Sequence, residues 1–192
     1  YGVGKGTVTT YQSVSGAGRK AIEELARQTA TLMNGQEVEV SSLPRQIAFN
    51  VIPQIGDFAE NGYTYEEIKM VKETQKIFNQ PDLQVNPTAV RVPVFYGHSE
   101  ALHVQLQQPV DLEHIEGLLK EAVGLTYCDE DYPMPTTHAA QHDGVFVGRL
   151  RRDLHDACAL NLWVVSDNVR KGAALNAVQI AELLVNRDRV LH

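Results

Sequence analysis

The segment TAVRVPVFYGHSEALHVQLQ, residues 88–107, is the part of the sequence that most clearly indicates the fold class. Residues 88–95 alternate between two sets of side chains, and residues 101–107 alternate again, which is the two-residue period of β-strands. Because Gly97, His98 and Ser99 separate the two runs, we expect two strands that pair antiparallel across this turn. Pro93 has no backbone donor, so the first strand is predicted to lie at a sheet edge or to contain a bulge.

Helical patterns flank this pair on both sides. Thr64 and Glu67 have the spacing of a capping box, which predicts a helix over 65–78. Apolar side chains at three-and-four spacing predict further helices over 22–33, 111–121 and 172–186. The side chains expected to point inward from two of these helices are Ile68, Val71 and Phe78, and Leu112, Ile115, Leu118 and Leu119.

Further strands are predicted over 7–11, 145–150 and 160–165, and residues 47–52 form a strand or an extended segment that ends at Pro53. Strands and helices follow one another without strict alternation. We therefore predict an α+β fold with a mixed, largely antiparallel sheet.

Length and charge exclude several classes of protein. The 192 residues suit one domain, and the net charge of −7 argues against nucleic acid, which requires a basic surface. No apolar run is long enough to span a bilayer, and the first residues lack the apolar core of a signal peptide, so we expect a cytoplasmic protein. The chain starts at Tyr1 just before a strand, which indicates a fragment of a longer chain.

Two polar residues stand out within residues 88–107. Arg91 lies on a strand face suited to burial, and His98 follows the strand end, where catalytic groups are often displayed. A guanidinium can bind a carboxylate through two parallel hydrogen bonds, and an imidazole can move a proton. The alternative is structural: Arg91 pairs with an internal carboxylate, and His98 is an ordinary loop histidine.

Other candidates are weaker. Glu66 and Lys69 share a helix face, which by itself is typical of a solvated, salt-linked surface. His138 and His142 have a spacing seen in metal sites, but no third ligand is placed nearby, so we predict no metal. Cys128 and Cys158 are expected to be reduced and unreactive, because no local basic group would lower the pKa of either thiol. No dinucleotide or phosphate-loop signature is present.

Five motifs in order along the chain resemble the second domain of bacterial aspartate-semialdehyde dehydrogenases. They are TYQSVSGAG (10–18), QIAFNVIP (46–53), EEIKMVKET (66–74), RVPVFYGHS (91–99) and DNVRKGAA (167–174). The resemblance covers nearly the whole chain. It implies a glyceraldehyde-3-phosphate-dehydrogenase-like C-terminal domain with helices on one sheet face, and a homodimer built through the large sheet.

The resemblance also implies an activity. The family interconverts aspartyl phosphate and aspartate semialdehyde in amino-acid biosynthesis (lysine, threonine and methionine), using NADP and a covalent cysteine intermediate. The resemblance implies a role for each of eight positions. His98 would be the proton acceptor, Arg91 the carboxylate clamp and Gln12 a residue that positions the substrate. Glu66 would lie near the substrate amino group, Lys69 would contact phosphate, Ser15 and Gly16 would approach NADP, and Asn168 would lie near the nicotinamide.

One departure limits what these 192 residues can do alone. The family's nucleophilic cysteine and its main NADP-binding domain precede the position matched by Gln12, and neither Cys128 nor Cys158 matches the nucleophile. We therefore expect the isolated chain to be inactive. Two alternatives stay open: a catalytically silent homologue or fragment that serves as a dimerisation module, and a reductase of a related acyl phosphate.

Overall fold

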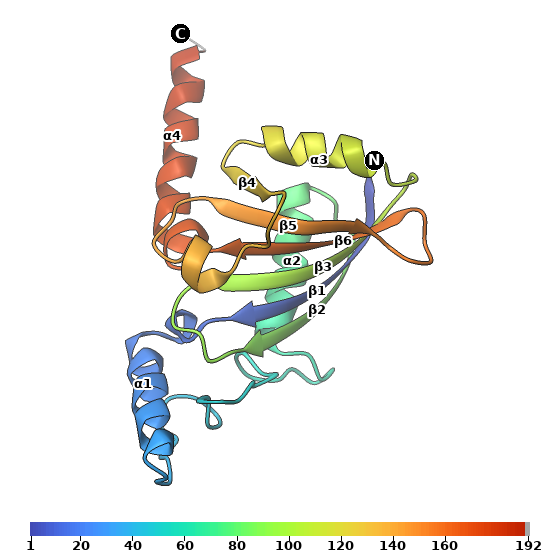
Figure 1. Ribbon diagram of the computed structural model, residues 1–192. Coiled ribbons are helices and arrows are strands. Elements are labelled where there is room, and N and C mark those ends of the chain that lie inside the picture. The colour runs from blue at the N-terminus through green and yellow to red at the C-terminus, as the bar shows by residue number, and fades with distance from the viewer. Residues whose placement is uncertain (191–192) are drawn as a thin grey trace.

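The structure is a computed structural model that describes the backbone of residues 1–190 and the side chains of residues 1–186. Its centre is a six-stranded mixed sheet in the order β2-β1-β3-β6-β5-β4 (Figure 1). The strands are β1 (Val3–Gln12), β2 (Gln84–Arg91), β3 (His98–Leu106), β4 (Leu125–Cys128), β5 (Val145–Arg152) and β6 (Ala159–Ser166). The helices are α1 (Arg19–Met33), α2 (Tyr65–Phe78), α3 (Leu112–Glu121) and α4 (Leu175–Val190), with short helical turns η1 (Val14–Ala17), η2 (Pro135–Ala139) and η3 (Arg170–Ala174).

The predicted α+β class with a mixed, largely antiparallel sheet is confirmed. β1 pairs with β2 and β4 pairs with β5 in parallel, whereas the β1–β3, β3–β6 and β5–β6 pairs are antiparallel. α2 packs on β2, and α3 packs on β4 and β5. α1 and α4 extend away from the sheet, one below it and one above it in Figure 1.

The predicted pairing of the two strands in 88–107 is wrong. β1 lies between β2 and β3, parallel to the first and antiparallel to the second. A long-range partner outcompetes the local hairpin, because Pro93 and the residues after it leave the sheet. β2 also begins four residues earlier than expected and ends at Arg91. Its position at the sheet edge, which Pro93 indicated, is confirmed.

Other boundaries needed smaller corrections. Residues 47–52 form no strand and pair with the sheet only through an isolated bridge between Ile52 and Arg91. β4 was not predicted, because four residues are too few to show a period. Phe78 and Leu118, expected to point inward, are about half exposed. Phe78 lines an open apolar hollow between the end of α2 and the sheet. α4 begins at Leu175, after the turn η3.

α2 begins as its sequence predicts. The Thr64 side chain accepts a hydrogen bond from the backbone of Glu67, and the Glu67 carboxylate accepts one from the backbone of Thr64. The other oxygen of Glu67 accepts the backbone N–H of Ala89 in β2 at 2.9 Å. One buried carboxylate therefore caps the helix and fixes the helix start against the sheet.

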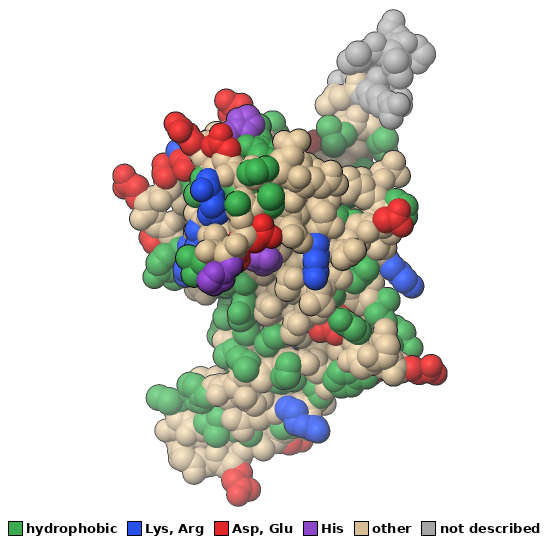
Figure 2. All heavy atoms as spheres, turned by 90° about the vertical axis from the view of Figure 1, so that its right-hand side faces the viewer, with side chains coloured by type: hydrophobic (Ala, Val, Ile, Leu, Met, Phe, Trp, Pro, Cys, Tyr) green, Lys and Arg blue, Asp and Glu red, His purple; other side chains and the backbone are tan. Residues whose placement is uncertain are grey.

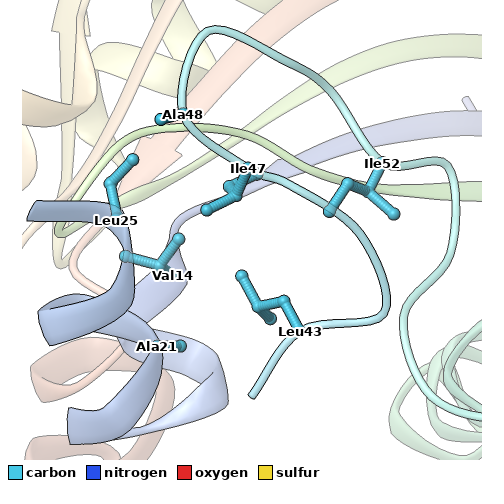
Figure 3. Close-up of a cluster of buried hydrophobic side chains, with 7 residues drawn as sticks. All are labelled: Val14, Ala21, Leu25, Leu43, Ile47, Ala48 and Ile52. Atoms are coloured by element: carbon cyan, nitrogen blue, oxygen red, sulfur yellow. The ribbon is translucent and has the colours of Figure 1, made fainter. Parts of the chain in front are cut away.

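A separate apolar cluster anchors the segment that follows β1. Figure 3 shows Val14 of η1 packed among side chains from α1 and from the loop after it. The buried members are Val14, Ala21, Leu25, Leu43, Ile47, Ala48 and Ile52. Because Val14 is fully buried, the two serines beside it, Ser13 and Ser15, are held in fixed positions.

Surface charge and hydropathy add two observations. Figure 2 shows acidic side chains gathered on the upper left of one face, with Lys and Arg side chains lying singly or in pairs. Within the described residues, no helix is both long enough and apolar enough to cross a membrane.

Candidate active site

The sheet topology brings three of the predicted site residues together. Because β1 and β2 run parallel, Gln12 and Arg91 are partners at the same end of the sheet, and the antiparallel β3 starts there with His98. Side chains alternate along each strand, so all three lie on the face that α2 covers. Residues 86 positions apart in the sequence thus form one cluster.

Arg91 is almost fully buried, with 6% of its surface exposed. Its Nη1 donates to the backbone oxygen of Ser13 at 2.8 Å. Burial lowers the pKa of the guanidinium, and the charge of Glu66 opposes that shift. Within residues 1–186 no carboxylate forms an ion pair with Arg91, so the internal partner of the structural alternative is not found there.

His98 is a half-buried strand residue rather than a loop histidine. Its Nδ1 lies 3.2 Å from the backbone nitrogen of Ser13 and 3.1 Å from the Ser13 hydroxyl. Burial, followed by the positive charge of Arg91, lowers the pKa of His98 to about 4, against a smaller opposing effect of Asp167. The ring is therefore neutral at physiological pH.

Gly16 lies directly over Arg91 and His98. A Cβ atom built on Gly16 would lie 3.0 Å from Arg91 Nη1 and 3.2 Å from His98 Nε2. Any side chain at this position would crowd both groups, so glycine keeps an opening above them. Within the described residues Nε2 makes no hydrogen bond and is not a buried unsatisfied atom, so it faces this opening.

Ser15 and Asn168 are joined to the same cluster. The Asn168 side-chain oxygen accepts from the backbone of Gly97 at 3.1 Å and from the hydroxyls of Ser15 and Ser13 at 3.1 and 3.2 Å. The Asn168 amide nitrogen donates to Ser15 at 3.0 Å. Asn168 thus ties the end of β6 to the loop before β3 and to η1.

Glu66 and Lys69 lie on the first turns of α2. Glu67 is occupied by the cap, whereas Glu66 is close enough to Arg91 to influence its pKa. Lys69 Nζ donates to Glu66 at 3.2 Å, and more than half of the Lys69 side chain is exposed. This is the ion pair that the alternative of a solvated, salt-linked helix face predicts. Among the described residues, Lys69 is connected to the cluster only through its contact with Glu66.

The remaining candidates lie elsewhere. Cys128 ends β4, three strands from β3, or about 14 Å at the usual strand spacing. Cys158 precedes β6 at the end opposite to Ser166, the β6 partner of His98. Both thiols are free, and burial raises the pKa of Cys128. The rings of His138 and His142 lie against Phe146, and no metal-binding group of three occurs among the described residues.

Sequence reasoning missed three residues that build the cluster. Ser13 contacts both Arg91 and His98. Asp167 is buried and accepts backbone N–H groups from Gln141 at 2.7 Å and from the two residues after Asn168 at 2.8 and 2.9 Å, which fixes Asn168. Gly97 has a positive φ of 84° and packs against Pro135. The Asp-Asn pair at 167–168 could have indicated the turn that Asp167 forms.

Comparison with known proteins places this chain in a family. Residues 1–171 match the family model described as "Semialdehyde dehydrogenase, dimerisation domain". The aspartate-semialdehyde dehydrogenase of Shewanella violacea is 56% identical over 187 residues, which is 96% of this chain and 55% of the relative. Aspartate-semialdehyde dehydrogenase 2 of Vibrio cholerae is 57% identical over 185 residues, with the same coverage.

A solved structure agrees with these matches. The crystal structure of aspartate semialdehyde dehydrogenase II from Vibrio cholerae, complexed with ASA, superposes with a TM-score of 0.93 at 56% identity. It is matched over 96% of this chain and 55% of its own length.

The fold and these likenesses define a dehydrogenase dimerisation domain, a mixed sheet with two covering helices and a polar cluster at one end. The chain belongs to the semialdehyde dehydrogenase dimerisation-domain family. It spans about 55% of the length of the curated relatives it matches and corresponds to their C-terminal part.

Proposed function

We propose that this chain is the substrate-binding and dimer-forming part of an NADP-dependent aspartate-semialdehyde dehydrogenase, which reduces L-aspartyl 4-phosphate to L-aspartate 4-semialdehyde and phosphate. The observation that supports this most directly is Arg91, a buried guanidinium that forms no ion pair among the described side chains. A buried charge without a counterion is costly, so the site is suited to an anionic ligand.

Each residue of the cluster then has a task. Arg91 holds the substrate carboxylate, Gln12 beside it orients the substrate, and Glu66 is placed for the substrate amino group. The exposed Lys69 contacts phosphate. His98 is the acid–base group at the reacting oxygen, which approaches through the opening at Gly16.

The nicotinamide supplies hydride transfer when it is bound, and the residues near Gly16 suit such a ring. Gly16 is exposed and has no side chain, so a flat group can approach the Nε2 atom of His98. Ser15 forms part of the same wall, and Asn168 supports it by hydrogen bonds, which gives Asn168 an indirect role. Two free thiols suit a reducing, cytoplasmic location.

The test is an assay of the full-length polypeptide that carries this chain. We expect NADP- and phosphate-dependent oxidation of L-aspartate 4-semialdehyde, and loss of most kcat/KM with an otherwise identical aldehyde that lacks the α-carboxylate. A folded protein with no turnover would favour a catalytically silent dimerisation module. Equal turnover of both aldehydes would contradict the clamp at Arg91.

We also propose that two copies of the chain associate through the sheet face opposite α2 and α3. This face contains a hollow of about 350 Å³, and its neighbouring strands present Thr9, Tyr11 and Trp163, the last two with ring centroids 5.5 Å apart. An isologous contact through such a face can bury the ~1,200 Å² or more of a stable dimer.

Sedimentation of the full-length protein tests this surface. Thr9→Arg places charge at the centre of the contact and should produce monomers. The control is Ile77→Arg on α2, where the residue is 80% exposed and lies on the other side of the sheet. A wild-type protein that sediments as a monomer at all concentrations would contradict the proposal.

A further inference from the structure

Ser13 touches both polar groups at the centre of the site. It is fully buried between β1 and η1. Its backbone N–H and its hydroxyl both face His98 Nδ1, and its backbone oxygen accepts from Arg91. Ser13 can therefore set the state of the imidazole without contacting a ligand.

The backbone N–H of Ser13 fixes where the imidazole proton resides. A backbone N–H can only donate, so at 3.2 Å the Nδ1 atom must present a lone pair. A neutral ring then has its proton on Nε2. In the opposite tautomer, the Nδ1–H of the ring would point at the backbone N–H of Ser13. This backbone N–H has no other partner among the described residues, so a buried donor would stay unpaired.

The hydroxyl of Ser13 is compatible with this state. The Ser13 hydroxyl lies 2.9 Å from Ser15 Oγ, 3.1 Å from Nδ1 and 3.2 Å from Asn168 Oδ1, so in the neutral ring it either shares the Nδ1 lone pair with the backbone N–H or donates to one of the other two oxygens. When the ring becomes positively charged, the hydroxyl can donate to Asn168 and accept from Nδ1.

We propose that Ser13 is a positioning residue that holds His98 in its Nε2–H tautomer, with Asn168 orienting the Ser13 hydroxyl. The ring then presents a hydrogen-bond donor at the opening beside Gly16, not a lone pair. Its task in the reaction rests on the function proposed above: the donor stabilises negative charge that develops on the substrate oxygen when hydride is added. The same Nε2–H group can pass its proton to that oxygen, which is the acid step assigned to His98 above.

The first test does not depend on turnover. Long-range proton–nitrogen NMR spectra of the full-length, ¹⁵N-labelled protein distinguish the two tautomers, and the His98 signals are assigned by their loss in His98→Gln. We expect the Nε2–H form at pH 7. Observation of the Nδ1–H form would overturn the proposal, whether or not the protein is active.

Two variants at position 13 separate the backbone N–H from the hydroxyl. Ser13→Pro removes the N–H at a position whose native φ of −65° is the angle that proline prefers, and its Cδ takes the place of that hydrogen, so the imidazole has to move away from position 13. Gln12 before it is in a strand, which proline tolerates. Ser13→Ala is the matched control, because it removes only the hydroxyl.

Ser13→Pro should allow the Nδ1–H form to appear and lower kcat by about 100-fold, with KM changed less because the backbone oxygen that binds Arg91 remains. Ser13→Ala should keep the Nε2–H form and lower kcat by about tenfold or less. A Ser13→Pro protein that retains only the Nε2–H form would contradict the proposal. If this variant does not fold, the wild-type spectrum still decides.

A pH titration adds a measurement that a purely structural role would not change. The charged groups facing His98 are Arg91 from β2 and Asp167 from the end of β6. Ser13→Ala should move the titration of His98 to lower pH, because the charged ring loses its acceptor. Asn168→Asp should move it to higher pH, because a carboxylate favours the charged ring. Unchanged titration in both variants would show that this network does not act on His98.

Discussion

Two buried polar clusters in this chain differ in how completely their atoms are bonded. Glu24 of α1 is 2% exposed and accepts the backbone N–H groups of Ser41, Ser42 and Leu43, the hydroxyl of Ser42 and the amide of Gln28. In the cluster of Arg91 and His98, the guanidinium lacks a counterion among the described side chains, and Nε2 is open.

The difference separates a structural role from a functional one. Burial raises the pKa of Glu24, but the hydroxyl of Ser42 and the backbone N–H groups of Ser41, Ser42 and Leu43 together lower it by more, so the net pKa lies below its usual value. The hydrogen-bond donors that the buried Glu24 carboxylate needs are all supplied by the chain itself. The site cluster instead keeps bonding capacity that no described group of the chain uses, in side-chain atoms that stay accessible to a ligand.

The largest effect is expected where bonding capacity is unused. Arg91→Lys in the full-length protein should lower kcat/KM for aspartate semialdehyde by two to four powers of ten, about 3 to 5 kcal/mol, because an ammonium cannot form two parallel hydrogen bonds with a carboxylate. NADP binding should barely change. Steady-state kinetics with wild-type values in a folded variant would place the clamp elsewhere.

At Glu24, where the hydrogen bonds are complete, a substitution should change the stability of the protein. Glu24→Gln leaves buried donors without acceptors and directs an amide toward backbone N–H groups, so the free energy of unfolding should fall by about 2 to 4 kcal/mol. Denaturant titration of the full-length protein measures it. The control Glu23→Gln, at a residue whose side chain is 60% exposed, should change stability by less than about 0.5 kcal/mol.

Acid should destabilise the two clusters in different pH ranges. The pKa of His98 falls from 6.5 to about 4 in the fold, so the unfolded chain binds the proton first and stability decreases as pH drops from 6.5 toward 4. Glu24 has a lowered pKa, so its contribution is present above 4.5 and is lost as pH falls through the folded value. His98→Asn should remove the pH dependence of stability only between pH 6.5 and 4. Glu24→Gln should remove it only in the lower range, below 4.5.

The smallest effects are expected at the cysteines, which belong to neither cluster. Cys128→Ser and Cys158→Ser should each keep kcat/KM within about twofold, since burial raises the pKa of Cys128 and Cys158 lies at the opposite end of the sheet. A loss of ~10³ in either folded variant would show that the nucleophile had been misplaced.

Local signals in the sequence were enough for some of these features. The capping box at Thr64 and Glu67 fixed the start of α2, and Pro93 indicated an edge strand, because both effects depend on neighbouring residues. The placement of β1 between β2 and β3 could not be predicted, since it depends on pairing between residues about 80 positions apart. Ser13 was missed for the same reason, because a serine shows its role only once His98 lies beside it.

The contacts that assemble the site also have a consequence for the order of folding. The contact between Ser13 and His98 closes a loop of 85 residues, and the contact between Ser15 and Asn168 closes one of 153. The entropy of such closures must be overcome before the contacts stabilise anything, and folding is slower the more a protein relies on contacts between residues far apart in sequence. α2 and α3 can form early from local interactions, whereas the imidazole and its serine meet only when β1, β3 and β6 have joined. During synthesis, no site of this kind can exist until the ribosome has released residue 168.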